Sequence, residues 1–252
     1  MATLPSSNNR SKVQPETGHS TKACSYDRAG LGWSDLGPGP RDVHRMVSEL
    51  HDLLQASGIS PPYLLVGYSL GGGIIRVFAA LHPQEVAGLI MVDALHPDFL
   101  RRMQLDAWDE NMLRTAKWMQ RVAPFGIARL EGRCAMDNRP LIQCRSFWKT
   151  FTDEREALPA SVRQIGEVAS LGNKPLIVLS RDPDPTVGWG TLENRRIWEK
   201  MQQELLQLST QSQQATVKGA SHYIQDDRPD AVNGAISRML TIVRVQPHSS
   251  SF

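Results

Sequence analysis

The hydrophobic residues of this chain follow two patterns that alternate along the sequence. Four short segments, either continuously apolar or apolar at every second position, predict buried strands. They are residues 63–66, 89–92, 176–179 and 214–218. Segments with apolar residues at helical spacing lie between them, around residues 43–54, 74–78, 197–205 and 231–243. Alternating helices and strands predict an α/β fold, with a mostly parallel sheet and helices on both faces.

Three parts of the chain fall outside this alternation. Residues 1–22 hold scattered apolar residues among many Ser, Asn, Thr and Pro, which predicts a disordered N-terminal lead. Residues 246–252 predict a flexible tail. Between about residues 97 and 171 the alternation stops, which predicts an insertion into a core of residues 23–245. The aromatic residues of this insertion are Trp108, Trp118, Phe125, Trp148 and Phe151.

The composition is that of a globular protein. The chain has 252 residues, of which 40% are hydrophobic, and this is enough for one sizeable α/β core. A formal net charge of +2 does not indicate nucleic-acid binding. The sequence contains no apolar run long enough to span a membrane and no signal peptide, so we expect a cytoplasmic location. The three cysteines have no metal-ligand spacing.

One serine lies between glycines where a predicted strand turns into a predicted helix. The run Val66-Gly67-Tyr68-Ser69-Leu70-Gly71-Gly72-Gly73 fits the G-x-S-x-G pattern. Glycines on both sides let the chain reverse sharply, so that the Ser69 hydroxyl projects above the sheet as a nucleophile. The Leu70 N–H at the start of the helix is then placed to stabilise an oxyanion.

A serine nucleophile needs a general base, and one histidine follows a predicted strand late in the chain. His222 lies on the loop that follows the strand of residues 214–218. This position suits a general base, whereas an isolated histidine more often makes only a loop hydrogen bond. Upstream, residues 23–27 look like a strand and lead into the glycine-rich loop Asp27-Arg28-Ala29-Gly30-Leu31-Gly32-Trp33-Ser34.

With these signals in this order, residues 22–245 resemble the α/β-hydrolase fold superfamily, in its serine esterase and haloperoxidase-like branch. The D-R-x-G-x-G-x-S loop and the G-x-x-H-x-x-x-x-D-x-P segment, with Asp227 and Pro229, carry the resemblance. It implies that Ser69 is the nucleophile, that His222 is the base and that the insertion is a helical cap. Members that open epoxides or displace halide carry an aspartate at the elbow, so Ser69 argues against those reactions.

The acidic member of the expected triad has three candidates. The family usually places this acid a few residues after the strand that is predicted here at 176–179, and counting along the chain leads to Asp184. One residue of slack in the turn would select Asp182 instead. Asp93, after the strand of residues 89–92, is a third option because some relatives place the acid one strand earlier. The alternative interpretation of Asp93 is a cap or loop hydrogen bond.

The resemblance fails at the N-terminus. Family members have three strands before the one that is predicted here at 23–27, and the third carries an H-G motif that supplies a second oxyanion donor. Neither the strands nor the motif is found here, and Gly18-His19 has the reverse order. We therefore expect an N-terminally truncated hydrolase, with unpaired strand edges costing about 1–3 kcal/mol per buried group. Loss of one oxyanion donor would lower the rate by about 10²–10³.

The residues therefore predict a serine hydrolase that cleaves a carboxylic ester or related acyl substrate through an acyl-enzyme. The expected partner is a small-molecule acyl or ester substrate, with no metal, no organic cofactor, no nucleic acid and no membrane span. Because the first strands are missing, two alternatives stand beside this prediction. They are a catalytically impaired, hydrolase-like binding protein and a gene fragment.

Overall fold

The computed structural model describes residues 7–104, 106–125, 141–184, 186 and 191–245. Its centre is a sheet of four parallel strands in the order β1-β2-β3-β4. The strands are β1 (Tyr63–Tyr68), β2 (Val86–Val92), β3 (Leu176–Arg181) and β4 (Ser212–Val217). β3 is buried along its whole length and β2 along most of it, as expected for strands covered on both faces. All four overlap the segments that the apolar pattern predicts.

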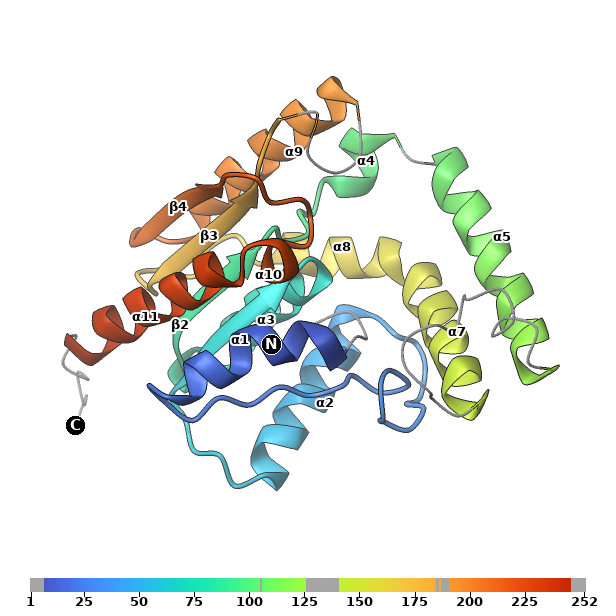
Figure 1. Cartoon of the computed structure of the whole chain (residues 1–252), viewed down its shortest axis with the longest axis horizontal. Coiled ribbons are helices and arrows are strands. Elements are labelled where there is room, and N and C mark those ends of the chain that lie inside the picture. The colour runs from blue at the N-terminus through green and yellow to red at the C-terminus, as the bar shows by residue number, and fades with distance from the viewer. Residues whose placement is uncertain (1–6, 105, 126–140, 185, 187–190, 246–252) are drawn as a thin grey trace.

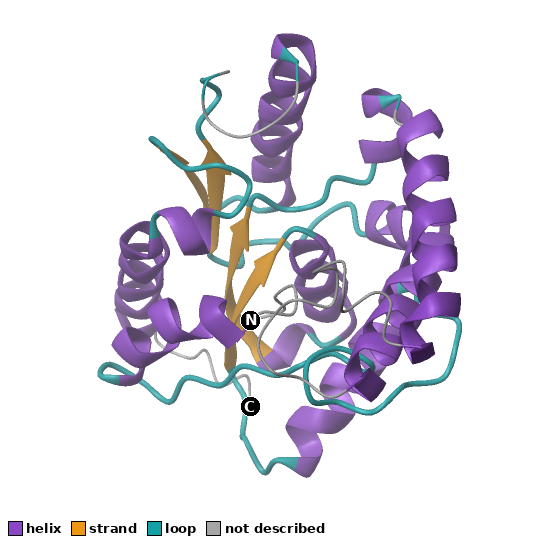
Figure 2. Cartoon of the chain, turned by 45° about the vertical axis from the view of Figure 1, so that its right-hand side comes forward, coloured by secondary structure: helices purple, strands orange, loops and turns teal. Residues whose placement is uncertain are grey.

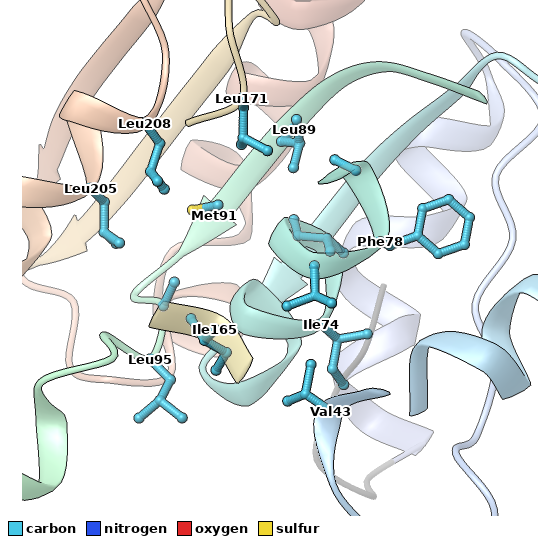
Figure 3. Packing of buried hydrophobic residues seen from close by; sticks show 14 of the residues in the cluster. Val43, Ile74, Phe78, Leu89, Met91, Leu95, Ile165, Leu171, Leu205 and Leu208 are labelled. Atoms are coloured by element: carbon cyan, nitrogen blue, oxygen red, sulfur yellow. The ribbon is translucent and has the colours of Figure 1, made fainter. Parts of the chain in front are cut away.

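Helices cover both faces of the sheet, which confirms the predicted α/β class (Figures 1 and 2). One face packs against helices from the middle of the chain, and Figure 3 shows part of this core around Ile74, Phe78 and Ile165. These helices are α2 (Val43–Ala56), α3 (Leu70–Leu81), α8 (Leu158–Glu167) and α9 (Leu192–Glu204), with the 3₁₀ turn η3 (Leu205–Leu208). A second 3₁₀ turn, η1 (Pro83–Glu85), lies between α3 and β2 and has no buried residue.

The second face packs against the two ends of the described chain. Its helices are α1 (Ser7–Gly18), the short α10 (Ile224–Asp227) and α11 (Pro229–Val245). Alternation along β2 divides its side chains between the two cores: Leu89 and Met91 enter the first, and Ile90 and Val92 enter the second. The sheet thus separates two apolar layers.

Helix α1 is a correction to the sequence prediction, because it lies where a disordered lead is expected. Val13 is 1% exposed and belongs to the second core, and α1 packs against α11. The Lys12 ammonium donates a hydrogen bond to the carbonyl of Asp226 (2.9 Å), and the Thr17 hydroxyl donates one to Asn233 Oδ1 (3.3 Å). These contacts come from residues more than 200 positions away, so local composition could not predict the helix.

Residues 23–27 are a second correction, since the structure has no strand there. Cys24 is exposed, and the segment is held by the side chain of Gln14, which donates to the Ala23 carbonyl (3.1 Å) and accepts from Ser25 (2.7 Å). Among the described residues β1 pairs with β2 alone. A strand forms only where a neighbour supplies ladder hydrogen bonds, and residues 23–27 have no such neighbour in the described chain.

The described part of the segment between β2 and β3 is largely helical. It contains α4 (Phe99–Met103), α5 (Asp106–Val122), the 3₁₀ turn η2 (Ala123–Phe125), α7 (Leu141–Glu156) and α8. α5 and α7 pack on each other, away from the sheet (Figure 1). A small separate core joins them, with Met119 and Ala123 buried against Val122 and Trp148. The tail of residues 246–252 lies outside the described residues. Within the described chain, no helix combines the length and apolar character that crossing a membrane requires.

A substitution at Val13 tests whether α1 is part of the fold. We expect Val13→Asp to lower the free energy of unfolding and to free α1 for proteolysis, because a carboxylate would be buried without a partner. Limited trypsin digestion after Lys12 and Lys22, with thermal melts, measures both effects. Glu16→Ala, at an exposed position of the same helix, is the matched control. Equal digestion of wild type and Val13→Asp would contradict the docking of α1.

Candidate functional site

Ser69 lies in a strained turn between β1 and α3. Its backbone has φ 51° and ψ −119°, a region that residues with a side chain rarely adopt. Space at this turn requires glycine: a Cβ on Gly67 would lie 2.3 Å from the Gly71 carbonyl oxygen, and one on Gly72 would lie 2.3 Å from Ala94 Cβ. The predicted sharp elbow is therefore present.

The backbone of Ser69 is tied to the end of the neighbouring strand. Its N–H donates to the Val92 carbonyl (3.0 Å), and its carbonyl accepts from the Leu95 N–H (2.9 Å). Ser69 is also the N-cap of α3, but its hydroxyl makes no capping hydrogen bond. Leu70, the first residue of α3, has its N–H at the positive end of the helix dipole. The turn thus presents a hydroxyl beside a helix N-terminus.

Asp93 is the residue that follows β2, and it is fully buried. It is also one of the described non-glycine residues with positive φ, at 43°. Its carboxylate is surrounded by donors: Oδ1 accepts from Trp198 Nε1 (2.8 Å) and from the Arg181 N–H (3.2 Å). Oδ2 lies 2.5 Å from Nδ1 of His222 and 3.5 Å from Nε of Arg181. A buried carboxylate is stable here because these groups replace its hydration.

His222 lies on the loop between β4 and α10, as its sequence position predicts. The short contact to a carboxylate places the imidazole proton on Nδ1 and directs Nε2 away from Asp93. The ring of Tyr68, the residue before Ser69, lies 4.8 Å from the His222 ring, which brings the histidine to the elbow. The hydrogen bonds between described residues do not join Ser69 to His222; such bonds often tighten only when substrate binds.

Asp184 and Asp182, the acids favoured by counting along the sequence, are bonded elsewhere. The Asp182 carboxylate accepts the N–H of Gly219 (2.6 Å) and of Asp184 (2.9 Å). Asp184 is exposed and accepts from the N–H and hydroxyl of Thr186, whose hydrogen bonds lower its pKa. Asp184 thus stabilises the loop after β3, and Asp182 joins that loop to the loop after β4. The structure therefore differs from the expected order and brings Asp93 to His222.

Two further groups at this site have no signal in the sequence. Trp198 lies in α9 next to an apolar position, where any large hydrophobic residue would fit the helical pattern. Arg181 ends β3, and its side chain is 8% exposed. Both reach Asp93 only through packing of α9 and β3 beside β2, which no local motif describes.

Among the described residues, two clusters of potential metal ligands lie outside this site. In the first, the rings of His51 and His82 stack in parallel (3.9 Å, 8°) beside Glu85, so their lone pairs do not converge on one ion. The second cluster is His96, Asp98 and Glu204, and Arg102 already binds both of its carboxylates at 2.7–2.9 Å.

His96, Arg102 and Glu204 also line a polar cavity of about 370 Å³ together with Arg76. This cavity includes neither Ser69 nor His222. The cluster at its wall is therefore best described as an ion-pair network, and burial lowers the pKa of His96 to about 4.

The sequence also matches known proteins. The family model described as "alpha/beta hydrolase fold" matches residues 8–132. "Uncharacterized protein YqjL" of Bacillus subtilis is 29% identical over 212 residues, which cover 84% of this chain and 70% of that protein. "Uncharacterized protein C23C11.06c" of Schizosaccharomyces pombe is 27% identical over 230 residues, 87% of this chain but only 42% of that protein.

Comparison of structures leads to the same fold. The chain is similar to MGS-M2, an alpha/beta hydrolase enzyme from a Medee basin deep-sea metagenome library, with a TM-score of 0.65. The match covers 94% of this chain and 86% of that one at 15% identity, so it is a likeness of fold. The chain therefore has the α/β-hydrolase fold, and the family model for that fold matches about half of its residues.

The elbow can be tested at Gly67. We expect Gly67→Ala to destabilise the fold by several kcal/mol or to abolish it, because the added Cβ meets backbone atoms that cannot move away. Gly234→Ala in α11 is the matched control, since its Cβ would meet nothing within 4 Å and alanine favours a helix by about 1 kcal/mol. Thermal and denaturant unfolding of both variants measures the difference. A Gly67→Ala protein as stable as wild type would contradict the close approach.

The lowered pKa of His96 predicts acid sensitivity. Between about pH 6.5 and pH 4, His96 is protonated in the unfolded chain but stays neutral in the folded chain. The free energy of unfolding therefore decreases as the pH drops through this range. We expect His96→Gln to lose less stability over this window than wild type. Denaturant unfolding at several pH values measures this difference. Parallel pH profiles for the two proteins would show that His96 is not the titrating group.

Proposed function

We propose that this protein is a serine hydrolase that cleaves a carboxylic ester or related acyl compound. Ser69 is the nucleophile, His222 the general base and Asp93 the acid that orients the base. The observation that carries this proposal is the 2.5 Å contact between His222 Nδ1 and the buried Asp93 carboxylate, beside a serine held at positive φ. Nucleophile, base and orienting acid thus follow three separate parallel strands and gather at one edge of the sheet.

The reaction proceeds in two halves. Ser69 Oγ attacks the carbonyl carbon while His222 Nε2 takes the hydroxyl proton; the tetrahedral intermediate collapses, and the alcohol leaves with that proton. Water then attacks the acyl-enzyme and gives a proton to His222, and His222 passes that proton to Ser69 Oγ as the bond to the acyl group breaks and the acid is released. Asp93 remains ionised throughout and stabilises the imidazolium that forms in each half. All bonds that form and break lie between substrate, water, Ser69 and His222.

The oxyanion of each tetrahedral intermediate needs hydrogen-bond donors. The Leu70 N–H is well suited because it begins α3 and directly follows the nucleophile. One such donor is typically worth about 10²–10³ in rate. Arrangement at a strained elbow fixes this N–H before substrate arrives, so little reorganisation is needed during the reaction.

The helices between β2 and β3 are proposed to be the cap that completes the substrate pocket. α4 begins six residues after Asp93, and Phe99 in α4 contacts Trp198, so the insertion starts next to the proposed acid. In α7 the aromatic rings of Phe147 and Phe151 contact each other, with their centroids 6.0 Å apart. This arrangement supports a small-molecule acyl or ester substrate, with the insertion excluding water during turnover.

Covalent labelling tests the nucleophile. A fluorophosphonate should label the wild-type chain at Ser69, and the chain should hydrolyse short p-nitrophenyl esters. Ser69→Ala should lose the label and about 10⁶-fold in kcat. A wild-type protein that melts cooperatively but shows neither label nor turnover would contradict the proposal and would favour a binding role for this fold.

Single substitutions test the acid. We expect Asp93→Asn to lower kcat by about 10⁴-fold, because the amide can no longer hold the Nδ1–H tautomer of His222. Asp184→Asn and Asp182→Asn should keep rates close to wild type, since both side chains bond only to loop groups. These two variants are the controls for charge loss near the site. If Asp93→Asn kept its activity while Asp182→Asn or Asp184→Asn lost it, the triad acid would lie in the loop after β3.

A further inference from the structure

The carboxylate of Asp93 is held by a group that the catalytic scheme does not yet use. Trp198 is 4% exposed, and its Nε1–H donates to Oδ1 of Asp93 at 2.8 Å. Because Oδ1 also accepts the Arg181 N–H, the second oxygen, Oδ2, is left facing His222. A carboxylate that could rotate about its Cβ–Cγ bond would not keep one oxygen on the imidazole.

The indole of Trp198 is itself fixed by its surroundings. The Arg181 guanidinium lies over the ring, 4.5 Å from its centroid. The rings of Phe99 and His222 meet it edge to face, at 5.9 Å and 5.8 Å and at 89° in both cases. Trp198 therefore touches both members of the acid–base pair, Asp93 through its N–H and His222 through its ring.

We propose that Trp198 is a positioning residue for the acid–base pair, and this inference rests on the function proposed above. Its N–H fixes the plane of the Asp93 carboxylate so that Oδ2 meets Nδ1 of His222. Its ring limits rotation of the imidazole, so that Nε2 is directed away from Asp93. The nitrogen and the ring act on different catalytic groups, and a phenylalanine would supply only the ring.

Burial alone does not explain the bond to Asp93. Trp148, in α7, has a buried Nε1 with no hydrogen-bond partner among the described residues. The protein thus tolerates an indole N–H without an acceptor where only the ring packs. At Trp198 the same atom donates to a buried carboxylate, and a hydrogen bond to a charged group is stronger than one between neutral groups. The two tryptophans form a natural pair for comparison.

Matched substitutions separate positioning from packing. Trp198→Phe keeps an aromatic ring and removes the donor, so kcat for p-nitrophenyl acetate should fall about ten- to hundredfold while KM changes little. Trp148→Phe should leave both parameters near their wild-type values. A loss that falls mainly on KM, or an equal loss in both variants, would overturn the positioning role.

A proton spectrum tests the same idea without turnover. The proton between His222 Nδ1 and Asp93 should give a downfield resonance in the wild-type protein, since the two atoms are only 2.5 Å apart. Asp93→Asn should abolish this resonance and Trp198→Phe should move it upfield, whereas Trp148→Phe should leave it unchanged. An unchanged resonance in Trp198→Phe would overturn the inference even if its kcat fell.

The outcomes distinguish the two proposals. Suppose the wild-type protein has no esterase activity but Trp198→Phe still moves the resonance. This result would contradict the proposed function and support the positioning of Asp93 by Trp198. Conversely, if the wild type is active and Trp198→Phe has the same activity and the same resonance, the proposed function is supported and the positioning role of Trp198 is contradicted. If Trp198→Phe does not fold, the indole N–H proton shifts of the ¹⁵N-labelled wild-type protein provide the test. The Trp198 proton should resonate downfield of the Trp148 proton. The opposite order would overturn the inference.

Discussion

The pairing of β1 with β2 determines where the functional side chains of this protein meet. Tyr68 pairs with Val92, so the next residue on each strand, Ser69 and Asp93, leaves the sheet at the same level. Because side chains alternate between the faces of a strand, a slip of one residue would move the side chains of the shifted strand to the wrong layer and separate Ser69 from Asp93. The two apolar cores enforce this register, since Leu89 and Ile90 must enter opposite layers.

The same two residues carry backbone strain. Ser69 and Asp93 both have positive φ, and each such residue typically costs about 1–3 kcal/mol. Hydrogen bonds between the two turns, from Ser69 to Val92 and from Leu95 to Ser69, help to offset this cost. The same backbone hydrogen bonds thus hold the strained turns at Ser69 and Asp93. A change in the conformation of one turn would therefore alter the other.

The sequence predicts those features that depend on neighbours along the chain. The elbow at Ser69, the four strands and the loop position of His222 follow from spacing and from glycines. The partner of His222 does not, because Asp93 lies 129 residues earlier and the choice among three acids depends on how loops fold over the sheet. Helix α1 was missed for the same reason: its burial depends on α11, and its composition suggests disorder.

The contact between α1 and α11 joins the beginning and the end of the described chain. Thr17 bonds to Asn233, 216 residues later, and Arg244 donates to the carbonyl of Ser20, 224 residues earlier. The core that Val13 joins also contains Val232, Ile236 and Met239 of α11, so during synthesis it is incomplete until α11 has emerged from the ribosome. The second face of the sheet is therefore completed only after α11 has been synthesised, and until then Ile90 and Ile177 lack the apolar partners that α11 supplies.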